Sequence, residues 1–180
     1  MTTTELTPVD DVRLRKMGAV FMSVFALVWA LAALPLDGNA RTVILVVAVA
    51  LTAATLALAV RVKGQDNETR DLAADWQQRY NRLGLIQFAA IALVVVTLIL
   101  LDAPQLIAPL VCLAVGLHFL PLATLFRQRL YRWTGVALAV VAVAGVAAAL
   151  TSDGETARLV TGLGAAVTLW ATSAGVSQAG

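Results

Sequence analysis

Six long apolar runs occupy most of this 180-residue chain and limit the folds that it can adopt. Each run approaches the roughly 20 residues that an α-helix needs to cross a hydrocarbon layer about 30 Å thick. The only charged residue inside any of them is Arg158, near the start of the last run. The pattern therefore predicts an all-α integral membrane protein with six transmembrane helices. The predicted spans cover residues 17–36, 42–60, 83–101, 104–126, 133–150 and 157–176.

Composition argues against a soluble protein with six buried helices. Hydrophobic residues make up 60% of the chain and charged residues 13%, whereas a soluble domain is about half apolar and about a quarter charged. Too little polar chain remains to cover six apolar helices in water. The first run is longer than the core of a secretory signal and no small-x-small cleavage site follows it, so we interpret it as an uncleaved helix.

Lysine and arginine are distributed unevenly along the chain. Eleven of the 13 lie in the N-terminal segment or in the loops after the second and fourth spans, and only Arg41 and Arg158 lie on the other side. Because cations are retained in the cytoplasm during insertion, both termini are expected to be cytoplasmic. Membrane orientation accounts for these cations, so nucleic acid is not an expected partner. The Ala-, Val- and Arg-rich composition resembles that of high-GC bacteria, which implies a bacterial inner (plasma) membrane.

The chain reads as three copies of one unit, each made of a basic segment, a helix, an aspartate-bearing turn and a second helix. The turns contain Asp37, Asp102 and Asp153, and aspartate suits them because it caps the N–H groups of a following helix. Three parallel hairpins suggest a bundle with approximate threefold character, an architecture similar to that of acid-stress membrane proteins built from three helix pairs. We divide the single membrane domain, 1–180, into a cytoplasmic N-terminal segment at 1–16, hairpins at 17–60, 83–126 and 127–180, and a cytoplasmic connector helix at 61–82.

Two features predict how these helices pack. Leu72, Trp76, Tyr80 and Leu83 recur near helical spacing, which favours an interfacial helix or a cytoplasmic extension of the third span for the connector. Small residues also line several helix faces, and such faces allow close helix packing in lipid. The sequence leaves open whether they pack within the chain or against another copy. They are Ala19, Ser23, Ala26, Ala30 and Ala33 in the first span, Gly135, Ala139, Gly145 and Ala149 in the fifth, and Gly162, Ala165, Ala166 and Gly175 in the sixth.

The fourth span carries the unusual intramembrane chemistry. It contains His118, the one histidine of the chain, together with Cys112 and the helix-breaking residues Pro109 and Pro121. An ionisable side chain at membrane depth suggests a functional site, and each proline leaves a backbone carbonyl without its usual donor. Two interpretations remain open. His118 either lines a small polar cavity with neighbours such as Gln87, or makes an interhelical hydrogen bond that stabilises the bundle.

The stretch Gly116-Leu-His-Phe-Leu-Pro-Leu-Ala123 resembles one in small bacterial six-span integral membrane proteins to which no activity is assigned. The resemblance implies the same membrane class and brings no substrate. It is limited to this stretch of the fourth span. Fold class is therefore the main expectation that it supports.

Functional classes are weighed by the residues that each would need. The sequence offers no catalytic triad, paired carboxylate, metal-ligand cluster or phosphate-binding glycine loop, so we expect no enzyme activity, cofactor or metal. The favoured hypothesis is an accessory or scaffold membrane protein that acts by helix–helix association, as a homo-oligomer or with a membrane-protein partner in the lipid bilayer. The alternative is a small-solute or proton-linked transporter or channel that uses the fourth span. Its candidate polar site is His118, Pro121, Cys112 and Gln87.

Overall fold

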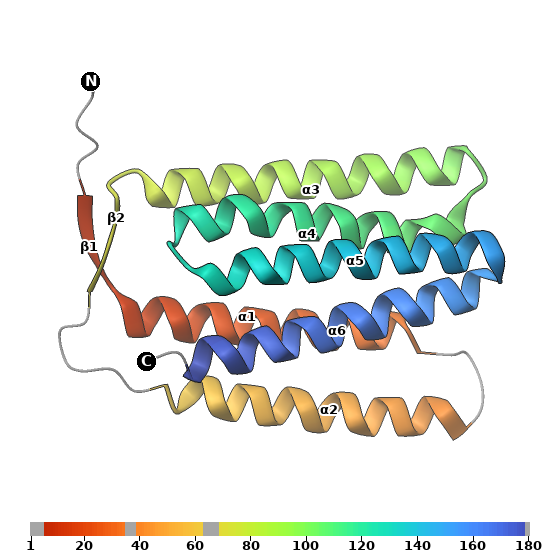
Figure 1. Ribbon diagram of the computed structural model, residues 1–180, viewed down its shortest axis with the longest axis horizontal. Helices are drawn as coiled ribbons and strands as arrows, with labels where there is room; N and C mark the ends of the chain where they lie inside the picture. The colour runs from red at the N-terminus through yellow and green to blue at the C-terminus, as the bar shows by residue number, and fades with distance from the viewer. Residues whose placement is uncertain (1–5, 35–38, 63–68, 179–180) are drawn as a thin grey trace.

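The structure is a computed structural model that describes residues 6–34, 39–62 and 69–178. Within these ranges the chain forms two short strands, six long helices and one short 3-10 helix (Figure 1). All six long helices are apolar and long enough to cross a membrane, which confirms the six predicted spans. In chain order the elements are β1 (Leu6–Asp10), α1 (Asp11–Ala32), α2 (Asn39–Val60), β2 (Thr69–Ala73), α3 (Trp76–Leu100), η1 (Pro104–Leu106), α4 (Ile107–Leu125), α5 (Arg129–Thr151) and α6 (Gly154–Gln178).

Successive long helices run in opposite directions (Figure 1). Helices α1, α3 and α5 begin at the end of the bundle where β1 and β2 lie, and α2, α4 and α6 return to it. We call this end the basic end, because most of the cations of the chain belong to it. Among the described residues these are Arg13, Arg15, Lys16, Arg61, Arg70, Arg79, Arg82, Arg127, Arg129 and Arg132.

The three hairpins do not pack as equivalent units. Helix α5 packs against α4 of the second hairpin, whereas α6 packs against both α1 and α2 of the first hairpin. The third hairpin therefore lies between the other two, and these share no extensive helix–helix interface in the described part of the chain. Figure 1 shows the resulting order, from α3 through α4 and α5 to α6 with α1, and then α2. This packing differs from the threefold bundle that the sequence repeat suggests.

Helix α6 is the centre of the bundle and α3 is its edge. Half of the most apolar stretch of α6 is buried, against 6% of the corresponding stretch of α3. The difference follows from composition, since the buried face of α6 consists largely of small and hydroxyl-bearing residues such as Gly162, Ala165 and Ser173. Helix α3 instead presents large aliphatic and aromatic side chains, such as Leu85 and Phe88, outward. Small residues thus decide which helices occupy the interior.

The small-residue face of α1 and most of that of α6 pack within the chain. All five members of the α1 face are fully buried. At the α1–α6 crossing a side chain on Gly162 would meet the Cβ atom of Ala33 at 2.5 Å and the carbonyl oxygen of Trp29 at 2.9 Å. At the α4–α5 crossing a Cβ atom on Gly135 would lie 2.7 Å from the carbonyl oxygen of Gly116. These helices approach closely because glycine stands at the crossing points.

The connector differs from the predicted helix over 61–82. Residues Thr69–Ala73 form strand β2, which pairs antiparallel with β1 so that Leu6 faces Ala73 and Asp10 faces Thr69. Leu72 is the buried residue of this strand, at 1% exposure. The helix begins only at Trp76, so one predicted alternative, an extension of the third span toward the basic end, describes residues 76–82. The strand was not predicted because its pairing partner lies about sixty residues earlier in the chain.

The aspartate turns differ from one another. The backbone N–H of Thr156 donates to Asp153 Oδ1 over 2.6 Å, so Asp153 caps α6 as predicted. This bond and others to nearby backbone groups hold the pKa of the exposed Asp153 carboxyl below its usual range. Asp102 is no cap; it adopts a left-handed backbone conformation with φ of 53°, which aspartate tolerates better than most residues. Asp37 lies outside the described residues.

Candidate functional site

The predicted site in the fourth span is dispersed over different faces of α4. Cys112 is fully buried, and its Sγ atom donates to the carbonyl oxygen of Leu138 on α5 over 3.4 Å. Pro121 lies inside the helix but is exposed at its surface. Pro109, in contrast, occupies the first turn of α4, where the helix has no earlier carbonyl for its missing N–H. Pro109 therefore lies outside the interior of α4, where the prolyl ring would interrupt the helix.

His118 is half-buried at the surface of α4, and Gln87 is half-buried on α3. Among the hydrogen bonds of the described residues none joins His118 to Gln87, Cys112 or another side chain. The four residues of the predicted site therefore share no network. The described residues also contain no group of three or more His, Cys, Asp or Glu side chains placed to hold a metal ion.

Hydroxyl groups form the polar contacts of the bundle interior, and they converge on α6. The Oγ atoms of Ser23 on α1 and Ser173 on α6 lie 2.9 Å apart, and Ser173 Oγ also donates to the carbonyl oxygen of Ala19 over 2.9 Å. All three residues are fully buried. A hydroxyl in hydrocarbon needs a partner, and here each hydroxyl finds one on the neighbouring helix.

Two further bonds join α6 to α5 and α2. The Oγ1 atoms of Thr134 and Thr172 lie 2.7 Å apart, and the indole Nε1 of Trp170 donates to Thr52 Oγ1 over 3.1 Å. Together with Ser173, these contacts place three helix–helix hydrogen-bond sites within four consecutive residues of α6. This part of α6 is therefore the polar core that joins the first and third hairpins.

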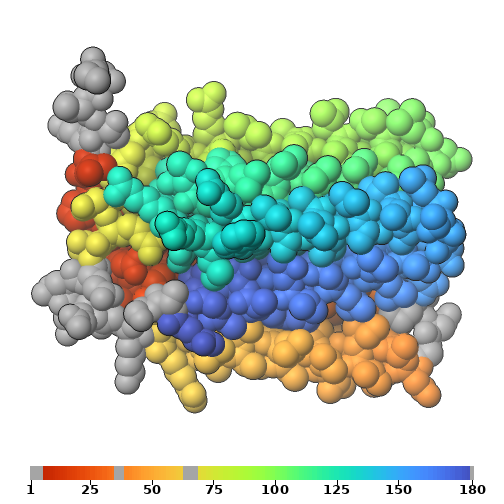
Figure 2. Space-filling model, in the orientation of Figure 1, coloured from red at the N-terminus to blue at the C-terminus, as the bar shows by residue number. Residues whose placement is uncertain are grey.

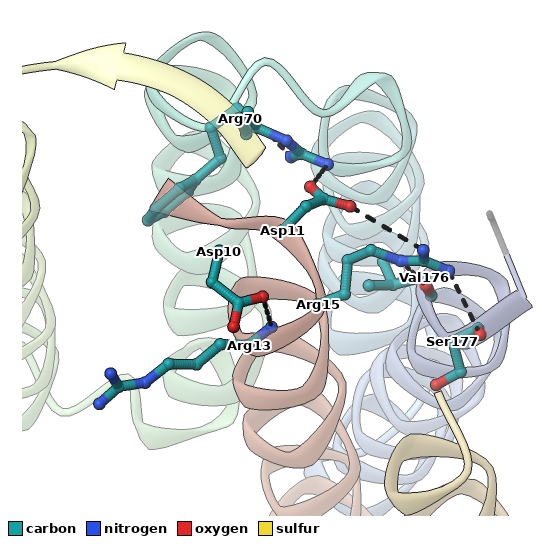
Figure 3. A network of polar contacts seen from close by, with 8 residues as sticks. Asp10, Asp11, Arg13, Arg15, Arg70, Val176 and Ser177 are labelled. Carbon is teal, nitrogen blue, oxygen red and sulfur yellow. Dashed lines mark hydrogen bonds and ion pairs between the residues drawn. The ribbon is translucent and has the colours of Figure 1, made fainter. Parts of the chain in front are cut away.

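A second polar network lies at the basic end, and Figure 3 shows it from close by. Arg15 on α1 is 3% exposed, and its Nε donates to the carbonyl oxygen of Val176 over 3.1 Å. Its Nη2 donates to the carbonyl oxygen of Ser177 over 3.4 Å. Its Nη1 lies 3.9 Å from Asp11 Oδ2, and Asp11 Oδ1 forms an ion pair with Arg70 Nη2. We call these five residues the Asp11 network.

Arg70 extends the network to the second hairpin. Its Nη1 donates to the carbonyl oxygen of Phe126, the residue that ends α4, over 2.6 Å. The ring of Phe126 makes edge contacts with Trp76 and Tyr80 of α3 and with Tyr131 of α5. Arg15 bonds to the end of α6 and Arg70 bonds to the end of α4. The carboxylate of Asp11 lies between these two cations and connects them.

The arginines of the Asp11 network bind the C-terminal ends of two helices. The last carbonyls of a helix lack internal donors and carry the negative end of the helix dipole. Arg15 supplies donors and charge to the end of α6, and Arg70 does the same for α4. Asp11 then balances the two buried or half-buried cations. The arrangement joins all three hairpins at one end.

Sequence reasoning assigned these arginines to membrane orientation and did not predict the network. One local signal was present, because Asp11 and Arg15 stand four residues apart and would share a helix face. The other partners are distant in sequence: they are Arg70 and the backbone carbonyls of Val176 and Ser177. Every residue has a backbone carbonyl, so a sequence pattern cannot indicate which ones accept a hydrogen bond from Arg15. Only the fold brings them together.

Comparison with known proteins found no relative of this chain. No protein-family model, no curated protein and no solved structure matches the chain.

Proposed function

We propose that the chain is a multi-pass protein of the bacterial plasma membrane, with cytoplasmic termini, that acts as an accessory or scaffold protein by helix–helix association. The observation that carries the proposal is the closed interior. The hydroxyls of Ser23 on α1 and Thr134 on α5 bond to hydroxyls of α6, Thr52 on α2 accepts from the indole N–H of Trp170 on α6, and the glycine crossings bring backbones into contact. Such an interior suits a rigid body that presents surfaces to other membrane proteins.

The edge helices supply the surfaces for this role. Helix α3 packs mainly on α4, and a Cβ atom built on its Gly84 would meet nothing within 4 Å. Helix α2 packs on α1 and α6 and leaves most of its length outward. Helix association in lipid depends on van der Waals packing and on small residues, and α3 carries such a residue at an open position.

The test is cross-linking in membranes with single cysteines placed at exposed positions of α3, in a Cys112→Ala background. We expect a specific cross-linked species from Phe88→Cys, with Val167→Cys on α6 as the matched exposed control. Equal yields from both positions, or no species from either, would contradict the association proposal.

The alternative is a transporter, and one observation supports it. His118 is half-buried at membrane depth beside Pro121, the proline inside α4. Proton-linked flux into liposomes, dependent on pH between 5 and 8 and lost in His118→Ala, would favour this alternative. Flux that survives His118→Ala and does not depend on pH would remove the proton-linked version of this alternative, and no flux at all would favour the association proposal. No catalytic step belongs to either proposal.

A further inference from the structure

An apolar groove follows the outer side of the α4–α5 seam. It consists of two adjoining hollows, one of about 340 Å³ beside Leu117 and Val136 and one of about 290 Å³ beside Leu113 and Leu150. Val143 lines both hollows, so they adjoin at its side chain, and we call the two together the groove. The groove walls are aliphatic throughout. Helices α4 and α5 belong to the face of the molecule seen in Figure 2.

The close helix crossing explains why a hollow exists here. Gly116 and Gly135 bring the two backbones together, and Gly135 and Ala139 leave a shallow floor between larger side chains. Leu117 and Leu120 on α4 form one wall of the hollow nearer the basic end. The groove is therefore a consequence of the same small residues that pack the helices.

Two cations stand at the end of this groove. Arg132 precedes Val136 by four residues and Arg129 precedes it by seven, so at 3.6 residues per turn both share its face of α5. Both side chains are exposed, and no ion pair of the described residues involves either one. Trp133, at 68% exposure, lies beside them, and an exposed tryptophan at a span end is typical of the membrane interface.

We propose that this groove binds an anionic phospholipid, with an acyl chain along the α4–α5 seam and the headgroup phosphate on Arg129 and Arg132. The dimensions agree with this assignment. The hollow nearer the basic end extends along α5 from Gly135 to Val143, about 12 Å at 1.5 Å per residue. A single leaflet contributes about half of the 30 Å hydrocarbon layer, so one acyl chain fits the depth available.

The chemistry of the site selects this ligand over others. An aliphatic groove that ends in two unpaired cations matches an amphiphile with one apolar chain and one anionic head. Basic sites between transmembrane helices on the cytoplasmic side bind anionic headgroups, and the proposed orientation places Arg129 and Arg132 on that side. Free phosphate would use the cations but leave the groove without a role. The inference does not depend on the association proposal.

The headgroup part is tested by native mass spectrometry of the full-length protein with phosphatidylglycerol or phosphatidylcholine. We expect the wild type to retain phosphatidylglycerol preferentially, and the double variant R129Q/R132Q to lose on the order of tenfold in that preference. The matched control is R13Q/R61Q, which removes the same charge from exposed positions at the basic end away from the groove. An equal loss in this control would overturn the site, since a diffuse surface charge would then explain the binding.

The acyl-chain part is tested by filling the groove. Val143→Trp places a large side chain where the two hollows meet, and Val167→Trp makes the same change at an exposed position of α6. We expect only Val143→Trp to reduce retention of phosphatidylglycerol. Unchanged retention in Val143→Trp, displacement of the lipid by inorganic phosphate, or a cross-linked second copy along the groove would each contradict the proposal.

Discussion

Arg15 on α1 and Val176 on α6 are joined by a buried hydrogen bond, in which the guanidinium Nε donates to the main-chain carbonyl oxygen over 3.1 Å. The two residues are 161 positions apart in the chain. The bond connects the beginning of the first helix with the end of the last. It therefore holds the two ends of the folded chain in register at the basic end of the bundle.

Replacing Arg15 tests this connection. Arg15→Gln removes the charge and the fork of donors from the buried carbonyls, and we expect the free energy of unfolding to fall by about 2 kcal/mol. Arg15→Lys keeps the charge but not the planar geometry, so its effect is expected to be intermediate. Unfolding in mixed micelles, followed by tryptophan fluorescence, measures both. The control is Arg13→Gln, at an exposed position two residues earlier on α1. We expect it to change the free energy of unfolding little.

The Asp11–Arg70 ion pair is expected to contribute more than an exposed pair of the same type. Arg70 and Asp11 are 21% and 15% exposed, whereas Arg79 and Asp75 are 57% and 47% exposed. A double-mutant cycle on Asp11→Asn and Arg70→Gln is expected to give a coupling above about 1 kcal/mol, the upper range of exposed pairs. The same cycle on Asp75 and Arg79 is expected to stay below it. Equal couplings would show that Asp11 does not connect the hairpins energetically.

Glycine at the α4–α5 crossing has a measurable role. Gly135→Ala places a Cβ atom 2.7 Å from the carbonyl oxygen of Gly116, so the backbones must separate. We expect a loss of about 1–3 kcal/mol in unfolding free energy. Gly84→Ala is the matched control, because a Cβ atom there meets nothing within 4 Å. It is expected to raise stability by about 0.5–1 kcal/mol, since alanine loses less backbone freedom in a helix. A stability gain in Gly135→Ala would contradict this account of the crossing.

Asp153 gives the bundle an acid-sensitive cap. Its pKa is lowered by the bond from the Thr156 backbone, so folding favours the charged form. The stability that this charge contributes is present at neutral pH and is lost as the pH falls below the usual range of an aspartate, about 4. Asp153→Ala is therefore expected to lower the unfolding midpoint at pH 7 and to differ less from wild type at pH 3. Asp102→Ala, at a turn whose aspartate is no cap, is expected to show no such convergence.

Hydropathy alone was sufficient to predict the six helices, because a membrane span depends on the total apolarity of about 20 neighbouring residues. The α1 small-residue face and the Asp153 cap were also predictable, since both depend on short spacings within one element. The order of the hairpins was not. It depends on which of several small-residue faces meet, and α1, α5 and α6 all offer one.

The polar networks were predictable in part only. Local spacing placed Asp11 and Arg15 on one face, but their connection to Arg70 requires the β1–β2 pairing, which joins segments on either side of the first hairpin. The emphasis on His118 shows the opposite case. A rare residue type drew attention, yet the structure places the buried hydroxyl contacts on common serine and threonine residues of α6.

The position of the third hairpin has a consequence for biosynthesis. Helices α1, α2, α4 and α5 all precede α6 in the chain, and all four pack against it. A ribosome delivers the segments in order, so the first and second hairpins enter the bilayer before the element that unites them exists. Until α6 inserts, the serines and threonines that it will engage have only lipid or one another as neighbours. Assembly of this bundle is therefore completed by its last helix.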